Sequence, residues 1–166
     1  MNLFKGVIAL AALATLAIPH QPAKAYENPH KTLIDTLEEV GIKVVTESPQ
    51  CEGRYGFFAP YLNGEPVIGL CESNITDMQT LYATVRHEAI HVAQLCKAMR
   101  GLPQSVAGYA LLKPEVNHYY MSRAQDNGWH ILGYAEEDWE IESEAFVLAN
   151  NWTAQQIETQ VRKYCL

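Results

Sequence analysis

A long stripe of apolar residues with helical spacing is the feature that most constrains how this chain can fold. Its members recur every three or four positions: Met78, Leu81, Tyr82, Val85, Ala89, Val92, Ala93 and Cys96. Such spacing places these side chains on one face of a helix. Thr76-Asp77-Met78-Gln79 has the form of a capping box, and Gly101 can end the helix. The sequence therefore predicts a helix from about 78 to 100 that buries one face.

Weaker patterns predict further helices before and after this one. Asn28-Pro29 is suited to begin a helix, and Gly41 is suited to end it. Near the C-terminus we expect a helical region from Glu136, with an interruption at Asn150-Asn151 and a new start capped by Thr153. A further helix is predicted over residues 114–124. The chain should thus be rich in helices around the apolar stripe.

A small antiparallel sheet is predicted between the first two helices. Ile42–Thr46 is β-branched and extended in character, and Pro49 ends it. Tyr55–Tyr61 and Pro66–Leu70 flank Asn63-Gly64, a pair that suits the positive φ angles of a two-residue hairpin turn. The predicted fold class is α+β, with a small antiparallel sheet packed on the central helix and on a C-terminal helix that carries glutamates.

The first 25 residues have the pattern of a cleavable signal peptide. Lys5 provides a basic start, Gly6–Ile18 is uncharged, and Ala23-Lys24-Ala25 has the small residues that signal peptidase reads. We expect export with cleavage after Ala25, which leaves residues 26–166 as one domain. The uncharged run is shorter than the roughly 18–20 residues that cross a bilayer, and no later segment comes closer. The mature protein is therefore not expected to span a membrane.

The charge balance excludes one class of partner. The chain has 12 basic and 19 acidic residues, and removal of the leader takes two lysines with it, so the formal net charge changes from −7 to −9. An acidic domain without a basic cluster repels phosphate backbones. Nucleic-acid binding is therefore not expected, whereas the oligomeric state stays open.

Four cysteines lie in the mature part of the chain, at positions 51, 71, 96 and 165. An even number of cysteines behind an export signal predicts two disulfides. Three pairings are consistent with the sequence, and it does not choose among them. A structural zinc site is the weaker interpretation, because no two cysteines have the close spacing that such sites use.

Inside the predicted central helix lies the motif His87-Glu88-Ala89-Ile90-His91, which has the pattern HExxH. At 100° per residue the two histidines lie one turn apart on the same side, so both imidazoles can bind one zinc ion. They point away from the apolar stripe, whose centre is Val85. Glu88 lies one step round the helix, where it can take a proton from an activated water and hand it to a leaving amine. The alternative is two solvated histidines on an amphipathic helix.

A third protein ligand is expected on the C-terminal helix. The remaining histidines of the mature chain offer no matching pattern: His30, His118 and His130. Glu142 falls on the apolar face beside Ala145 and Ala149, where a carboxylate is costly unless it is paired or bound to metal. Glu144 lies at the edge of that face, and Glu140 lies outside it. We therefore favour Glu142 as the ligand, with Glu144 as second choice and solvated glutamates as the alternative.

An HExxH motif followed some 50 residues later by a helical glutamate resembles the gluzincin group of zincin metallopeptidases. In several of its families the ligand glutamate stands three residues before an alanine, as Glu142 does here before Ala145. Other members place it directly before Ala or Gly, which would favour Glu144. The resemblance covers two short motifs and the order of elements, and it does not assign a named family.

The resemblance also implies a strand beside the metal helix along which a peptide substrate lies, a role that Pro66–Leu70 could fill. One position departs from the pattern, since Phe146 stands where an acidic residue often orients a ligand histidine. Support for the ligands would then come from elsewhere, with Glu144 and Asp138 as candidates.

Peptide hydrolysis also needs a donor to the developing oxyanion, often Tyr or His. Four side chains between the motifs are candidates by position: His118, Tyr119, Tyr120 and His130. Their alternative role is aromatic packing against the metal helix.

The sequence therefore predicts an exported zinc metallopeptidase that cleaves a peptide or protein substrate. In this hypothesis His87, His91 and Glu142 hold Zn²⁺ and Glu88 is the general base. The first alternative is a non-catalytic module of zincin-like fold with a structural metal or a partner-binding role. The second is a secreted disulfide scaffold without metal. Cleavage specificity and the final compartment stay open.

Overall fold

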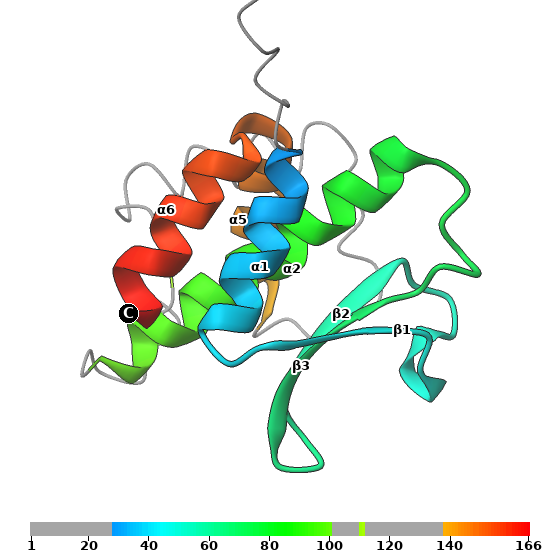
Figure 1. The fold of residues 1–166 in the computed structure, drawn as a ribbon, viewed down its shortest axis with the longest axis horizontal. Helices are drawn as coiled ribbons and strands as arrows, with labels where there is room; N and C mark the ends of the chain where they lie inside the picture. The colour runs from blue at the N-terminus through cyan, green and yellow to red at the C-terminus, as the bar shows by residue number, and fades with distance from the viewer. Residues whose placement is uncertain (1–27, 101–109, 112–137) are drawn as a thin grey trace, which may run out of the picture.

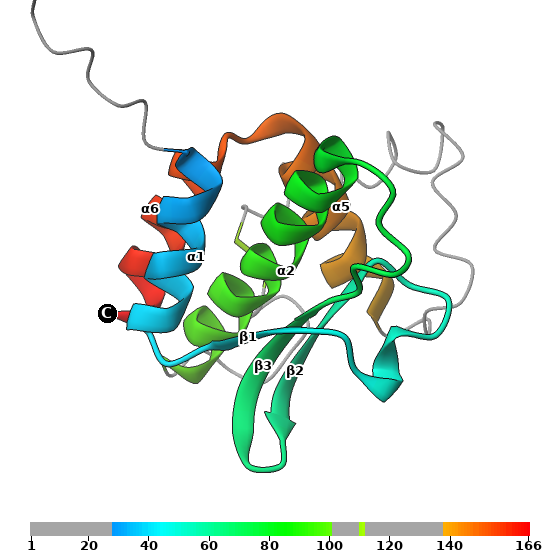
Figure 2. The ribbon, with the colours of Figure 1, turned by 45° about the vertical axis from the view of Figure 1, so that its right-hand side comes forward.

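The computed structural model describes residues 28–100, 110–111 and 138–166, and in these ranges the fold is α+β, as predicted. The elements follow one another as α1 (Pro29–Glu39), β1 (Lys43–Thr46), the short 3₁₀ helix η1 (Pro49–Cys51), β2 (Gly56–Leu62), β3 (Glu65–Leu70), α2 (Met78–Met99), α5 (Trp139–Asn151) and α6 (Ala154–Cys165). α1 and α6 lie side by side on one flank of α2, and the sheet lies on another (Figures 1 and 2). The predicted leader and the helix expected over 114–124 lie outside the described residues.

The helix starts follow local capping chemistry. Asn28 caps α1 by accepting from the His30 amide, and Thr153 forms a capping box at α6, both where the sequence predicts them. For α2 the predicted capping box at Thr76 is wrong by one residue. Asp77 is the cap instead, because its carboxylate accepts from both the backbone N–H and the hydroxyl of Thr80, each at 2.8 Å.

The predicted hairpin of β2 and β3 is confirmed. Asn63 and Gly64 have φ angles of 54° and 89°, as the two-residue turn between Leu62 and Glu65 requires. Gly69 on β3 leaves room for the ring of Phe57 on β2, because a Cβ there would lie 2.1 Å from a ring carbon.

The expectation of an antiparallel sheet is wrong, because β1 pairs with β3 in parallel and the sheet is mixed, in the order β1-β3-β2. The reason is burial. From Val67 to Leu70 every residue of β3 is buried, as in a central strand, whereas β2 is mostly half-buried. With β3 in the centre, both of its edges are paired. Pro66–Leu70 therefore has no free edge for a substrate. Among the described strands, β2 is the edge strand that follows β3 in the order of the sheet.

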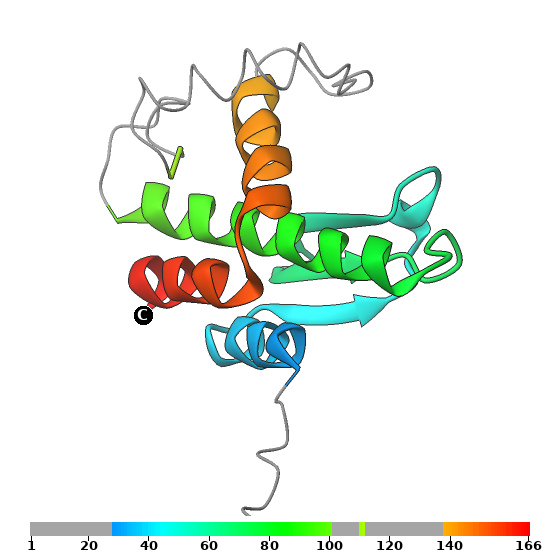
Figure 3. The same cartoon turned by 90° about the horizontal axis from the view of Figure 1, so that it is seen from above.

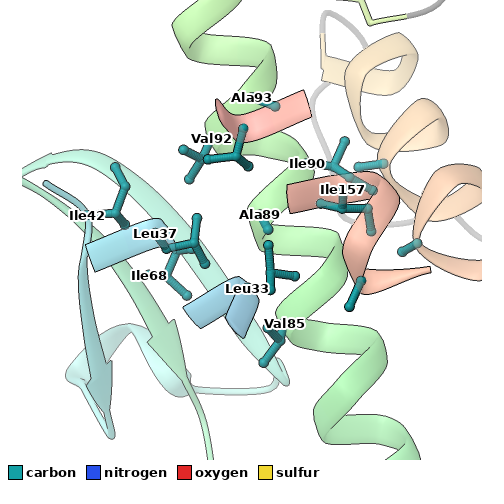
Figure 4. Packing of buried hydrophobic residues seen from close by; sticks show 14 of the residues in the cluster. Leu33, Leu37, Ile42, Ile68, Val85, Ala89, Ile90, Val92, Ala93 and Ile157 are labelled. Carbon is teal, nitrogen blue, oxygen red and sulfur yellow. The ribbon is translucent and has the colours of Figure 1, made fainter. Parts of the chain in front are cut away.

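The hydrophobic core lies where α1, α2, α5, α6 and β3 meet (Figure 4). Leu33 of α1, Ile68 of β3 and Ile157 of α6 point into it and are almost completely buried. Ala89 and Ala93 on α2 have no exposed surface, and small side chains at these positions let neighbouring helices approach closely. α5 crosses α2 on the side away from α1, while α6 runs alongside α2 (Figure 3). This crossing brings the glutamates of α5 over the middle of α2.

Both predicted disulfides are present, and the structure selects one of the three pairings. Cys51 is bonded to Cys71, and Cys96 is bonded to Cys165. The first bond fixes the segment before β2 to the end of β3. The second joins the C-terminal ends of α2 and α6 and closes a loop that contains all of α5. Within the described residues, no helix has the length and apolar character needed to cross a membrane.

Candidate metal centre

The two histidines of the HExxH motif lie in the middle of α2 and are buried. Each side chain is only 11% exposed, so the alternative of two solvated histidines is wrong. The Nε2 atoms of His87 and His91 are 3.1 Å apart. Adjacent turns of one helix therefore present two nitrogen atoms to the same point.

Glu142 of α5 completes this arrangement. Its Oε2 atom lies 3.3 Å from His87 Nε2 and 3.4 Å from His91 Nε2. That oxygen is buried, and neither imidazole nitrogen meets it with the geometry of a regular hydrogen bond. A buried carboxylate is costly unless a positive charge lies beside it, which a protonated imidazole or a bound metal ion can supply.

The three distances fit a small tetrahedral ion. Bonds of about 2.0–2.1 Å to zinc separate neighbouring ligand atoms by roughly 3.3–3.4 Å, and the observed separations are 3.1, 3.3 and 3.4 Å. Glu88 also has a carboxylate oxygen in this region, because ligand atoms of His87, Glu88 and His91 all lie within 4.8 Å of one another. This buried group of His and Glu side chains could hold a metal ion.

Charge and burial act against each other in this cluster. Burial alone would lower the pKa of His91, but the carboxylates of Glu142 and Glu88 and the Gln94 side chain raise the pKa to about 9. Burial would raise the pKa of Glu142, whereas the two imidazoles lower its pKa to about 2. For Glu88 burial prevails and raises the pKa above its usual range, against the opposing effect of the imidazoles. The metal-free cluster thus holds a proton on His91 next to an ionised Glu142.

Glu144, the second choice for the third ligand, is not at the edge of a face but completely buried. Its Oε2 accepts hydrogen bonds of 2.8 Å from Leu111 N–H and from the Gln94 side chain. The oxygen of the same Gln94 amide faces His91, because Gln94 Oε1 lies 2.8 Å from His91 Nδ1. The structure therefore connects Glu144 to His91 through Gln94, a residue that the sequence analysis missed.

The surroundings of His87 differ. The Phe146 ring packs on its imidazole with 4.4 Å between centroids, so the aromatic residue contacts the histidine where the resemblance implies an acid. His87 Nδ1 is buried and lacks a hydrogen-bond partner among the described residues. Asp138, the other candidate for orienting a histidine, lies at the start of α5 and lines a hollow beside the cluster.

The edge strand β2 passes directly beside Glu88. A Cβ at Gly56 would lie 3.2 Å from Glu88 Oε1 and 2.5 Å from Thr84 Cγ2, so only glycine permits this approach. Two hollows of about 590 and 650 Å³ open here, and Gly53, Arg54, Gly56, His87 and Glu88 line both. The candidate centre therefore borders both hollows.

Arg54 is a second residue that the sequence analysis missed. Of the described side chains that line the hollows, it is the one arginine or lysine. Its backbone is fixed, because the Asn74 side chain donates to the carbonyl groups of Arg54 and Cys51, each at 2.7 Å. No local motif marks it, since it lies 33 positions before the HExxH motif. The sequence did offer a signal for Gln94, because this residue lies three positions after His91 on the polar side of the helix.

The remaining candidates do not join this cluster in the described structure. His30 stacks on Tyr82 and lies 2.9 Å from Arg86 Nη1, away from the metal centre. The candidate oxyanion donors His118, Tyr119, Tyr120 and His130 lie outside the described residues.

A family model described as "Domain of unknown function (DUF8637)" matches residues 16–166. No curated protein and no solved structure gives a significant match to the chain. The match covers the HExxH motif, both candidate ligand glutamates and all four cysteines, but its description names no activity.

Proposed function

The chain belongs to the DUF8637 family, whose function is unknown, and we propose that it is an exported zinc-dependent peptidase. The observation that carries the proposal is the convergence of three ligand atoms, His87 Nε2, His91 Nε2 and Glu142 Oε2, at 3.1–3.4 Å from one another. Two imidazoles and one carboxylate are a ligand set of catalytic zinc sites, which leave a fourth position for water or substrate. Export is supported by the leader pattern and by two disulfides, which form in oxidising compartments.

In this proposal His87, His91 and Glu142 hold the zinc. The proposal also extends the chain's resemblance to gluzincins to a zincin-like fold. When bound, zinc supplies Lewis-acid activation of a water molecule and polarises the scissile carbonyl group. Glu88 lies within 4.8 Å of the metal-binding nitrogens and is buried. It accepts the proton of the attacking water and delivers it to the leaving amine.

β2 holds the substrate in this mechanism. Within the described residues its outer edge has no partner strand, and it runs beside Glu88, so an extended peptide can pair with the backbone there. The two hollows receive the side chains on either side of the scissile bond. This is a different strand from Pro66–Leu70, whose edges are both paired.

Arg54 provides the donor for the developing oxyanion. It lines both hollows together with His87 and Glu88, at the place where the scissile bond must lie. A guanidinium group offers several N–H donors and keeps its charge at any physiological pH.

The test is the variant Glu88→Gln in the zinc-loaded protein. We expect one bound zinc per chain in both native and variant protein, peptide hydrolysis by the native chain, and its loss in the variant. Glu38→Gln, at an exposed position of α1, is the matched control and should retain activity. Undiminished hydrolysis by Glu88→Gln would refute the mechanism. A native protein that binds zinc but cleaves no peptide in a broad library would favour the non-catalytic module.

A further inference from the structure

Gln94 is buried between the two helices that carry the metal-binding side chains. It lies on α2 three residues after His91 and is 1% exposed. A primary amide is costly to bury unless its hydrogen-bonding groups are satisfied. Both its nitrogen and its oxygen have partners. Each partner is either a proposed zinc ligand or lies within two residues of one along the chain.

The orientation of the amide follows from its partners. Gln94 Nε2 lies 3.2 Å from the Ile141 carbonyl oxygen and 2.8 Å from Glu144 Oε2. A carbonyl and a carboxylate can only accept from an amide, so both N–H groups of Gln94 must point at α5. The opposite orientation would bring the amide oxygen against two other oxygens. The Gln94 oxygen therefore faces His91.

This orientation determines which nitrogen of His91 carries the proton in its neutral form. Gln94 Oε1 lies 2.8 Å from His91 Nδ1, and an amide oxygen can only accept. Nδ1 must then be the protonated nitrogen, which leaves the lone pair on Nε2. That lone pair points to the place where His87 Nε2 and Glu142 Oε2 converge.

The same amide holds the second helix. Its acceptors, Ile141 and Glu144, lie on either side of Glu142 on one turn of α5. Glu144 is itself held by the Leu111 N–H at 2.8 Å. A single side chain thus orients a ligand on α2 and docks the turn of α5 that carries the third ligand.

We propose that Gln94 is a positioning residue of the zinc site, which selects the metal-binding tautomer of His91 and sets the distance of Glu142 from the two imidazoles. This inference rests on the proposed zinc site but not on peptidase activity. Outer-shell partners of this kind typically contribute 10- to 100-fold in metal affinity. The contribution of Gln94 should therefore appear in zinc binding before any substrate is added.

The experiment compares zinc affinity of the full mature chain and the variant Gln94→Met, by competition with a chromophoric chelator. Methionine has a similar size but neither accepts from His91 nor donates to α5. We expect the affinity to fall about 10- to 100-fold. Gln155→Met, at an exposed position of α6, is the matched control and should bind zinc like the native chain.

A second readout separates positioning from mere packing. The tautomer is read from the ¹⁵N shifts of the metal-free chain at a pH where His91 is neutral, because zinc bound to Nε2 would itself force the proton onto Nδ1. There the native chain should show a single tautomer with the proton on Nδ1, whereas Gln94→Met should populate both tautomers, while circular dichroism and the melting profile of the metal-free protein still show a folded chain. Unchanged zinc affinity together with an unchanged His91 signal in Gln94→Met would overturn the inference.

Glu144 provides a further pair of variants in case Gln94→Met does not fold. Glu144→Gln keeps an oxygen that accepts from Gln94, and zinc affinity should stay within about threefold of the native value. Glu144→Leu removes the acceptor and should lower affinity by about 10-fold or more. Equal affinities in the two variants would also overturn the inference. Absence of hydrolysis in every variant and in the native chain would count against the peptidase proposal alone.

Discussion

Zinc binding at neutral pH should release about one proton, and the proton should come from His91. In the metal-free protein the pKa of His91 is about 9, because the neighbouring carboxylates outweigh the effect of burial. At pH 7 the imidazole is then protonated in about 99% of molecules. Zinc binds only the neutral imidazole, so the proton must leave. The apparent affinity at pH 7 should therefore be about 100-fold below its value above pH 9, and should rise about tenfold per pH unit in between.

Isothermal titration calorimetry in buffers of different ionisation enthalpy measures the number of protons released. Proton release should be close to one at pH 7 and about one half at pH 9, where half of the His91 side chains are already neutral. NMR titration of the metal-free protein assigns the proton to the imidazole.

Glu142→Gln is the informative variant for this prediction. Loss of the carboxylate leaves His91 buried beside a neutral amide, and burial then moves its pKa down from about 9. Proton release at pH 7 should fall towards zero, and zinc affinity should fall as well because a ligand is lost. Glu38→Gln should leave both quantities unchanged. Release of only about one quarter of a proton or less in the native chain at pH 7, with a His91 midpoint near 6.5 or below, would refute the contact between His91 and Glu142.

Four further outcomes follow from the structure. Arg54→Gln should lower kcat about 100-fold or more if Arg54 stabilises the oxyanion, while Arg100→Gln at the end of α2 should not, as steady-state kinetics would show. Gly56→Ala should lower both kcat and the free energy of unfolding, the latter by about 1–3 kcal/mol, because its Cβ would lie 2.5 Å from Thr84 Cγ2 and 3.2 Å from Oε1 of Glu88, the proposed general base. Cys165→Ser opens a disulfide with a separation of 69 residues and should cost about 4 kcal/mol in denaturant unfolding. Finally, the raised pKa of His91 implies that the metal-free protein is stabilised below pH 6.5, and this contribution should disappear as the pH rises through about 9 in pH-dependent unfolding.

Several features of the fold were predictable because they depend on neighbours along the chain. The periodic stripe of α2 and the caps Asn28 and Thr153 act within one or two helical turns, and the structure shows these helices where the sequence predicts them. The hairpin was predictable for the same reason, since Asn63 and Gly64 readily adopt the backbone angles of its turn. Proximity of His87 and His91 also follows from helical geometry alone.

Other features depend on packing between distant segments. The parallel pairing of β1 with β3 follows from the burial of β3 in the centre of the sheet, which no local pattern in β1 reveals. The choice among three cysteine pairings also depends on which helix ends and strand ends meet. The expectations of an antiparallel sheet and of a substrate strand at Pro66–Leu70 failed for this reason.

In the candidate metal centre, too, some features follow from local spacing and others from packing between distant segments. The sequence alone determined that two histidines and a glutamate share one helix, because their spacing matches the helical repeat. Only the tertiary structure decided that α5 crosses α2 so that Glu142 faces both imidazoles, while Glu144, two residues on, bonds Gln94. The physical reason is that a helix crossing is set by the sum of many side-chain contacts across the interface, whereas the spacing within a helix is set by its own backbone hydrogen bonds.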